Sequence, residues 1–243
     1  MSTPKSLAVL YEDENFIAVN KPARLLVHKT ELSTDRTAAL QIVRNQTGQH
    51  VYPVHRLDRA TSGVLLFGKS PEAHKYASEQ FAERKVKKSY LTVIRGWPTE
   101  EQGLIDSPLK KENGEEQEAL SAYKILFKVD YPYPVSKFPS SRYSLLRVMP
   151  QTGRMHQIRR HVRRLSGPVI GDTTYGAGVH NRFFKETLKV KNLLLFAEAL
   201  LFYDMEGNPV HVQGTLSEDF ATVMEIFEWP EEQIPPVEYF SFS

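Results

Sequence analysis

Short apolar runs separated by turns dominate this sequence and limit the class of fold that it can adopt. Leu7–Tyr11 and Phe16–Asn20 are two such runs, and the polar residues 12–15 between them predict the turn of a hairpin. Val64–Phe67 is an unbroken apolar run between two glycines, which is typical of a buried strand. Many strands follow one another in hairpin-like order, with only a few helices between them. The sequence therefore predicts an α+β fold with a mixed, mainly antiparallel central sheet flanked by helices.

The remaining elements are predicted from periodicity and from capping signals. Ser70-Pro71 is a typical helix start, with Ser70 as the N-cap and proline at the first helical position. Further strands are predicted at Lys88–Gly96, Ala119–Val129, Ser141–Met149, Leu193–Tyr203 and Pro209–Gln213. Helices are predicted at Asp35–Gln46, Met155–Leu165 and Ser217–Phe227, and a loop or hairpin tip is predicted at Lys110–Glu118.

Length and composition limit the organisation of the chain. The 243 residues suffice for one large domain or two small subdomains. The chain has no cysteine, which excludes disulfides and thiolate zinc sites. The best apolar run, Leu193–Phe202, is too short to span a bilayer, and the apolar stretch near the amino terminus is too short for a secretory signal. We therefore expect a cytoplasmic protein.

The net charge of +2 conceals a strong asymmetry along the chain. Arg154–Leu165 contains five arginines and no acid, whereas Leu216–Ser243 contains seven acids and no lysine or arginine. On the predicted helix one side is apolar and the remainder is basic; the apolar residues are Ile158, Val162 and Leu165, and the basic ones are Arg159, Arg160, Arg163 and Arg164. A solvated helix surface is one interpretation. Like charges without acidic partners at i,i+4 spacing repel one another, however, which favours a polyanionic partner.

The segment His55–Gly63 sets one carboxylate, that of Asp58, between the guanidinium groups of Arg56 and Arg59. Two neighbouring positive charges favour the ionised form of a carboxylate, so we expect an anion suited to nucleophilic or base chemistry. Such a cluster is in many proteins only a structural ion-pair network. These residues alone leave both roles open.

Two other patterns point to no cofactor. Gly63–Ser70 satisfies the phosphate-binding loop pattern, but its apolar centre is itself the predicted strand, whereas that loop needs backbone N–H groups facing solvent. His156 and His161 are five residues apart and so lie on different helix faces, and no metal-binding motif accompanies them. We therefore expect neither a nucleotide nor a metal.

Four motifs, in order along the chain, resemble those of the RluA family of RNA pseudouridine synthases. They are His55–Gly63, Lys88–Leu91 followed by Gly96, Gly153–Arg159, and Gly171–Gly176. The resemblance covers the chain from about Leu7 to Gly214. It implies the pseudouridine synthase fold, with an active-site cleft across the sheet. It also indicates that residues 1–243 form a single catalytic domain without the S4 RNA-binding module. We expect a monomer.

The resemblance implies roles for individual residues. Asp58 would be the catalytic residue, Arg154 its ion-pair partner, and Tyr90 the tyrosine that stacks on the target base and handles the C5 proton. The implied RNA contacts are Arg56, which enters the RNA helix where the target nucleotide leaves, Ile158, which packs against the uracil, and the helix arginines Arg159, Arg160 and Arg163. From the residues alone, Arg154 also fits a surface phosphate contact, and Tyr90 and Ile158 fit the core. Phe196 departs from the histidine usual in the family, which concerns packing near the site more than chemistry.

The reaction implied by the resemblance is the cofactor-free isomerisation of uridine to pseudouridine in RNA after base flipping. Asp58 would either attack C1′ of the ribose or remove a proton from C2′. Gln49–Val51 and His180–Phe183 resemble the branch of the family that modifies uridine 65 of the tRNA acceptor stem. We therefore expect tRNA as the substrate, with ribosomal RNA as the alternative. Two other classes stay open: a noncatalytic RNA-binding protein, and a glycoside hydrolase, which would need a second carboxylate at the site.

Overall fold

The structure is a computed structural model that describes residues 4–29, 37–165 and 167–239. It divides into two compact units. The first unit takes residues 1–88 and 197–216 of the chain, and the second takes residues 89–196 and 217–243. The boundaries between the units fall within strands β5 (Lys87–Arg95) and β11 (Leu195–Tyr203).

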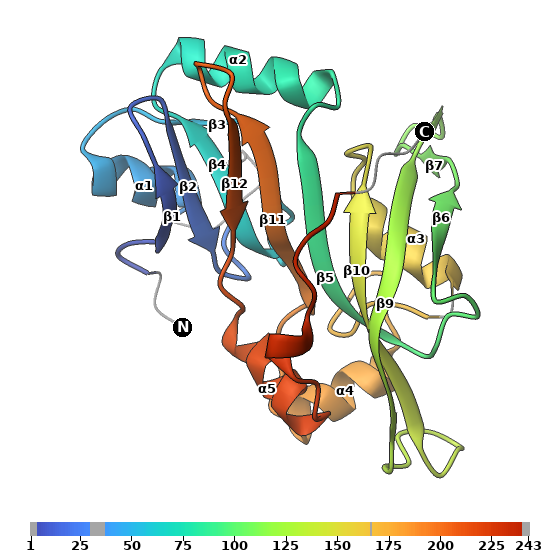
Figure 1. The fold of residues 1–243 in the computed structure, drawn as a ribbon. Helices are drawn as coiled ribbons and strands as arrows, with labels where there is room; N and C mark the ends of the chain where they lie inside the picture. The colour runs from blue at the N-terminus through green and yellow to red at the C-terminus, as the bar shows by residue number, and fades with distance from the viewer. Residues whose placement is uncertain (1–3, 30–36, 166, 240–243) are drawn as a thin grey trace. The chain divides into compact units, whose positions relative to one another are not determined.

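The first unit is built around β4 (Ser62–Gly68), a strand in which every residue is buried. This strand lies between β2 (Phe16–Lys21) and β11; β1 (Val9–Glu12) pairs with β2, β12 (Pro209–Gln213) pairs with β11, and β3 (Tyr52–Pro53) pairs with β4 (Figure 1). The buried strand predicted at residues 64–67 is therefore confirmed. Most of the phosphate-binding loop pattern falls on this strand, whose residues are all buried.

Every second side chain along the strands of the first unit points toward helix α2 (Pro71–Ala82) and forms a core with it. Phe16 and Ala18 of β2 pack with Val64 and Leu66 of β4, and the helix adds its small residue Ala73. The predicted cap is present, since the Ser70 hydroxyl oxygen accepts a hydrogen bond from the Ala73 N–H at 3.1 Å. Helix α1 (Ala39–Thr47) begins later than predicted; residues 35 and 36 of that prediction lie outside the described residues.

The second unit has the strand order β5, β10 (Ser141–Pro150), β9 (Leu120–Tyr131), β6 (Gln102–Asp106). A small hairpin of β7 (Leu109–Lys110) and β8 (Glu116–Gln117) occupies the segment predicted as a loop or hairpin tip. The helices of this unit are α3 (Gln157–Leu165), α4 (Gly178–Glu186), α5 (Glu218–Ile226) and the 3₁₀ turn η1 (Glu231–Gln233). The prediction of an α+β fold with a mainly antiparallel sheet is confirmed, whereas β6 and α4 were not predicted.

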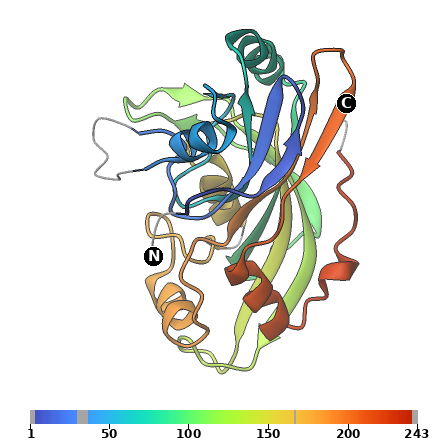
Figure 2. The ribbon, with the colours of Figure 1, turned by 90° about the vertical axis from the view of Figure 1, so that its left-hand side faces the viewer.

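Helices α4 and α5 belong to the second unit (Figures 1 and 2). An aromatic cluster holds them to the sheet of this unit. Its centre is Tyr143 of β10, whose ring stacks on Phe227 at 5.3 Å and meets the edge of Phe184 at 5.1 Å. The Tyr143 hydroxyl also shares a hydrogen bond of 2.9 Å with Nδ1 of His180. Burial, and then the charge of Arg95, lowers the pKa of His180 to about 4, so this ring is neutral at physiological pH. Among the residues described, none of the helices has the length and apolar character needed to cross a membrane.

Candidate active site

Asp58 lies in the loop of residues 54–61 that joins β3 to β4 in the first unit, called here the Asp58 loop. Val54 and Leu57 are buried and anchor the loop in the core. Asp58 is half-buried between the exposed Arg56 and Arg59, and its backbone carbonyl accepts a hydrogen bond from the N–H of Thr61 at 3.0 Å. The loop therefore presents two cationic side chains at the surface and partly covers the carboxylate between them.

A buried lysine supports this loop from within the first unit. Lys21, at the end of β2, has no exposed surface, and its ammonium group donates hydrogen bonds to the carbonyls of Leu25 at 2.8 Å, Pro22 at 3.0 Å and Arg59 at 3.3 Å. Burial lowers the pKa of Lys21 to about 7, and the negative charge of Asp58 partly opposes that shift. The lysine therefore links the chain after β2 to the Asp58 loop.

Sequence reasoning did not single out Lys21. The available signal was its place as the only charged residue of a strand that is otherwise apolar except for Asn20. A lysine is almost never fully buried without partners, and here three backbone carbonyls supply them.

His55 and Gly63 shape the two ends of the motif. The Nε2 atom of His55 accepts a hydrogen bond from the N–H of Leu66 at 3.1 Å, and its ring stacks on Phe81 at 5.1 Å. Burial, and then the charge of Lys88, lowers the pKa of His55 to about 3, so the ring is a neutral acceptor. Gly63 has φ of +110°, and a Cβ atom there would lie 2.2 Å from the carbonyl oxygen of Ala197. Both residues therefore serve the packing of β4.

Arg154 lies in the second unit, in a turn of residues 152–157 that precedes α3, called here the Arg154 turn. The side-chain oxygen of Gln157 accepts hydrogen bonds from the N–H of Arg154 at 3.0 Å and from the hydroxyl of Thr152 at 2.7 Å. The Nε atom of Arg154 donates to the carbonyl of Glu118 at 2.9 Å. The backbone and the side chain of Arg154 are thus both oriented. The helix begins two residues later than the predicted start at Met155, because His156 has φ of +55°, which no α-helix allows.

Arg159 is directed into the protein rather than toward solvent. Only 6% of it is exposed, and its Nε and Nη2 atoms donate to the carboxylate of Asp172 at 2.7 and 2.8 Å. Burial disfavours the charged carboxylate, but hydrogen bonds from Arg159 and from the N–H groups of Tyr175 and Thr174 outweigh it and lower the pKa of Asp172. The arginines of this helix have no acidic partner at the i,i+4 spacing, but Arg159 has one elsewhere in the chain. Its partner is 13 residues away along the chain, outside the helical spacing that was considered.

The other predicted residues of the second unit divide between core and surface. Tyr90 is half-buried on β5, paired with Val148 of β10, while Ile158 is only 6% exposed and belongs to the core. Arg163 is exposed and Arg160 is half-buried. Asp58 and Arg56 belong to the first unit and these residues to the second, so the predicted pairing of Arg154 with Asp58 stays a prediction. The predicted uracil contacts of Tyr90 and Ile158 also stay predictions.

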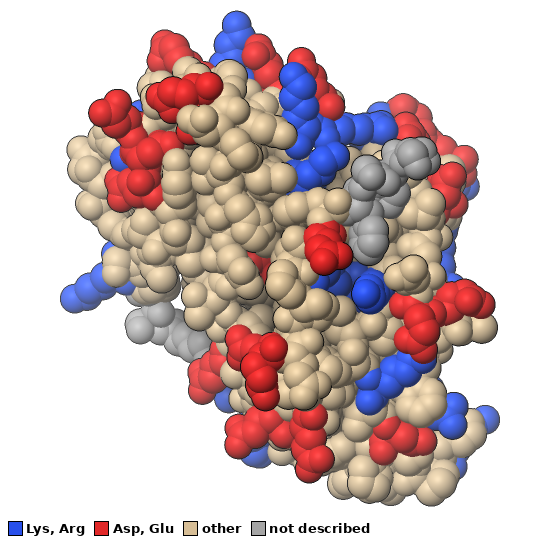
Figure 3. All heavy atoms as spheres, in the orientation of Figure 1, with Lys and Arg blue, Asp and Glu red and all other residues tan. Residues whose placement is uncertain are grey.

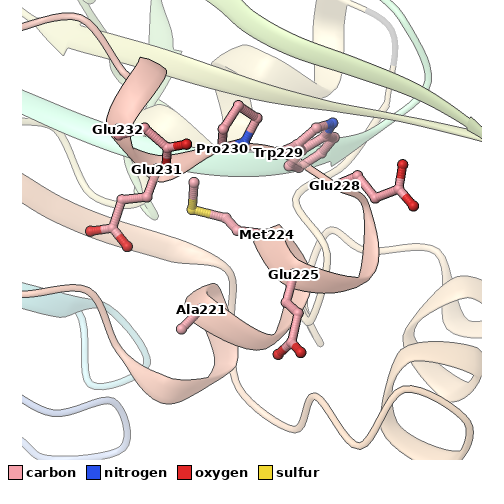
Figure 4. A pocket seen from close by; sticks show the side chains of 8 residues that line it. All are labelled: Ala221, Met224, Glu225, Glu228, Trp229, Pro230, Glu231 and Glu232. Carbon is pink, nitrogen blue, oxygen red and sulfur yellow. The ribbon is translucent and has the colours of Figure 1, made fainter.

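A shallow pocket of about 430 Å³ lies elsewhere in the second unit, between α5 and η1. Met224 extends across it, and the carboxylates of Glu225, Glu228, Glu231 and Glu232 lie around its rim (Figure 4). Figure 3 shows the acidic side chains gathered over this part of the molecule. Such a surface repels phosphates, so it does not form an RNA site. Within the described part of the chain, His, Asp and Glu side chains form no group of three that would hold a metal ion.

Comparisons with known proteins define the class. The family model described as RNA pseudouridylate synthase matches residues 15–164, and the chain therefore belongs to that family. The predicted family is thus confirmed.

Two relatives narrow the comparison further. The chain is 42% identical to a protein of Vibrio parahaemolyticus, covering 95% of this chain and 99% of the relative. It is also 42% identical to one of Pasteurella multocida, covering 92% of this chain and 97% of the relative. Both relatives are named tRNA pseudouridine synthase C.

Solved structures show the same fold at lower identity. Human RNA Pseudouridylate Synthase Domain Containing 4 has a TM-score of 0.71 at 22% identity, covering 91% of this chain and 93% of that one. Human RNA Pseudouridylate Synthase Domain Containing 1 has a TM-score of 0.69 at 22% identity, covering 93% and 97%.

Proposed function

We propose that this protein isomerises uridine to pseudouridine in tRNA, with uridine 65 of the acceptor stem as its target. The observation that carries the proposal is the Asp58 loop, in which the family's aspartate motif is anchored at Leu57, supported by Lys21 and flanked by two exposed arginines. The name of the relatives, tRNA pseudouridine synthase C, supports tRNA rather than ribosomal RNA as the substrate.

In this proposal the Asp58 carboxylate acts on the ribose of the flipped uridine, by attack on C1′ or by removing a proton from C2′. Arg154 pairs with Asp58 and orients its carboxylate. The bond between N1 and C1′ breaks, the uracil turns beside Tyr90 and Ile158, and C5 bonds to C1′ in place of N1. C5 then loses its proton with the help of Tyr90 and N1 takes up a proton, so the product is an isomer of uridine and the reaction needs no co-reactant beyond proton exchange with water.

The RNA contacts in this proposal come from arginines that are exposed or half-buried. Arg56 is exposed beside Asp58, as a side chain that fills the space left by a flipped base must be. Arg160 and Arg163 contact phosphates, because α3 turns them away from its buried side. We assign Arg159 instead to the interior, where it neutralises Asp172.

The decisive experiment measures tritium released from tRNA that carries 5-tritiated uridine. Wild-type protein should release tritium, and Asp58→Asn should abolish release. The affinity for tRNA should stay within about tenfold, because Asp58 acts in the chemical step and is not expected to supply most of the binding energy. Asp106→Asn, a matched change at an exposed carboxylate of β6, should behave as wild type. Release by Asp58→Asn would refute the mechanism. Release from ribosomal RNA but not from tRNA would favour the alternative substrate, and no release by wild type from either would favour a noncatalytic RNA-binding protein.

We also propose that the protein acts in the cytoplasm as a monomer. The proposed tRNA substrate supports the location. Light scattering of the purified protein should give a mass near 27.8 kDa, and a mass of twice that value would refute the monomer.

A further inference from the structure

The Arg154 turn contains a backbone conformation that needs support. His156 has φ of +55°, in the left-handed region that residues other than glycine enter uncommonly, although asparagine, aspartate and histidine do so more often than the rest. Such conformations persist when the surroundings hold them, and they are frequent at functional sites. Met155 is 53% exposed, so this turn presents its outer side to solvent.

One side of the turn is held by Gln157. Besides accepting from Arg154 and Thr152, its amide group donates to the carbonyl of Leu120 at 3.0 Å and to the hydroxyl of Ser121 at 2.9 Å. Gln157 is buried, so these hydrogen bonds fix the turn to the start of β9.

Tyr175 contacts the turn at His156 itself. Its hydroxyl oxygen lies 3.1 Å from Nδ1 of His156, within hydrogen-bonding distance, and the two rings meet edge to face at 5.6 Å. Tyr175 is in turn fixed by its N–H, which donates to Asp172 at 2.9 Å, and by the guanidinium of Arg159, which lies 5.1 Å from its ring centre. A continuous set of contacts therefore runs from the buried Asp172 and Arg159 pair, through Tyr175, to His156.

We propose that Tyr175 is a positioning residue that, through the hydrogen bond of its hydroxyl to His156, holds the Arg154 turn in the left-handed conformation that orients Arg154. This inference rests on the proposed function of Arg154 as the partner of the catalytic aspartate. It assigns a task to the motif of residues 171–176, which is to support the turn beside α3 from the interior of the second unit.

The first test removes only the hydroxyl. Tyr175→Phe should lower kcat for tritium release about 3- to 10-fold, the effect of one neutral hydrogen bond, and leave KM for tRNA within about twofold. Tyr133→Phe, at an exposed tyrosine of the same unit, is the matched control and should behave as wild type. A raised KM with unchanged kcat would instead mean that Tyr175 contacts the RNA and would overturn the proposal, as would kinetics equal to wild type.

The second test examines the backbone conformation. His156→Gly and His156→Ala both remove the ring, but glycine adopts positive φ without strain and alanine does not. His156→Gly should therefore retain the higher kcat of the two. Equal values in folded variants would mean that the conformation of the turn does not matter, which contradicts the proposal.

A double-variant cycle links the two residues. Because Tyr175 acts through the His156 ring, Tyr175→Phe should change kcat by less than about twofold in the His156→Gly background. The same loss in both backgrounds would overturn the proposal. Different results would contradict the proposed function itself, namely tritium release by Asp58→Asn or no release by the wild type.

Discussion

The contrast between Arg159 and Arg163 gives the sharpest prediction of the structure, because both belong to one helix and only one is buried. Arg159→Met keeps an unbranched side chain but leaves the Asp172 carboxylate, which has no exposed side-chain surface, without its cation. The N–H groups of Thr174 and Tyr175 still donate to it. Removing one partner of a buried ion pair costs about 3–5 kcal/mol of unfolding free energy.

Urea unfolding followed by circular dichroism measures this loss. With a slope of about 2–3 kcal/mol per molar urea for a protein of this size, the midpoint should fall by on the order of 1–2 M for Arg159→Met. Arg163→Met is the matched control, since the same change at an exposed position should leave the midpoint unchanged. In tRNA binding, Arg163→Met should have the larger effect of the two substitutions. Arg163→Met should reduce the slope of log affinity against log salt by about 0.7–0.9, the share of one phosphate contact, and Arg159→Met should not.

The pH dependence provides an independent check on the pair. The pKa of Asp172 in the folded protein lies below its usual value of about 3.9, so the stabilisation is complete above that value and is lost as the pH falls through the lower folded value. Asp172→Asn should therefore flatten the acid limb of the stability curve. If Arg159→Met unfolds like the wild type and instead lowers the salt slope, Arg159 contacts phosphate in solution and the reasoning is refuted.

Two further predictions concern the first unit. Because the pKa of Lys21 falls from 10.5 to about 7, the unfolded chain binds more protons between these values, so the free energy of unfolding should rise with pH in that window. Lys21→Met should lack the rise in urea unfolding at pH 7 and pH 9, and a rise of equal size in that variant would exclude Lys21 as its source. Gly63→Ala should lower stability by about 2 kcal/mol or more, because its Cβ would meet the Ala197 carbonyl at 2.2 Å in a backbone of positive φ. A thermal midpoint equal to that of wild type would contradict this.

Much of the fold was predictable because the signals that specify strands and helices are local. The apolar run of β4 and the Ser70 cap of α2 each depend on a few neighbouring residues, and both predictions are confirmed. Strand β6 was not predicted. Strand β6 is defined by its pairing with β9, which is distant in the sequence, and the five residues of β6 carry no strong strand pattern of their own. The start of α3 was misplaced because the conformation of His156 depends on contacts with residue 175.

The residues of the candidate site could be predicted from the sequence better than the contacts that surround them. The motif around Asp58 and the cluster of arginines in α3 are features of consecutive residues. Lys21 was not, since a lysine at the end of a strand looks the same in sequence whether it is solvated or fully buried. The roles of Gln157 and Tyr175 could not be predicted either, because both act through hydrogen bonds to segments distant in the sequence.

Local patterns in the amino-acid sequence suffice to predict most strands and helices, the family of the protein and the position of its aspartate motif. Periodicity, caps and motifs express these properties within short windows. Which charges are buried, and what neutralises them, follows from the packing of distant segments. In the folded protein Arg159 pairs with Asp172, 13 residues away, and Lys21 is buried against the Asp58 loop. The physical reason is that desolvation and pairing depend on every segment packed around a charge, and no local pattern carries that information.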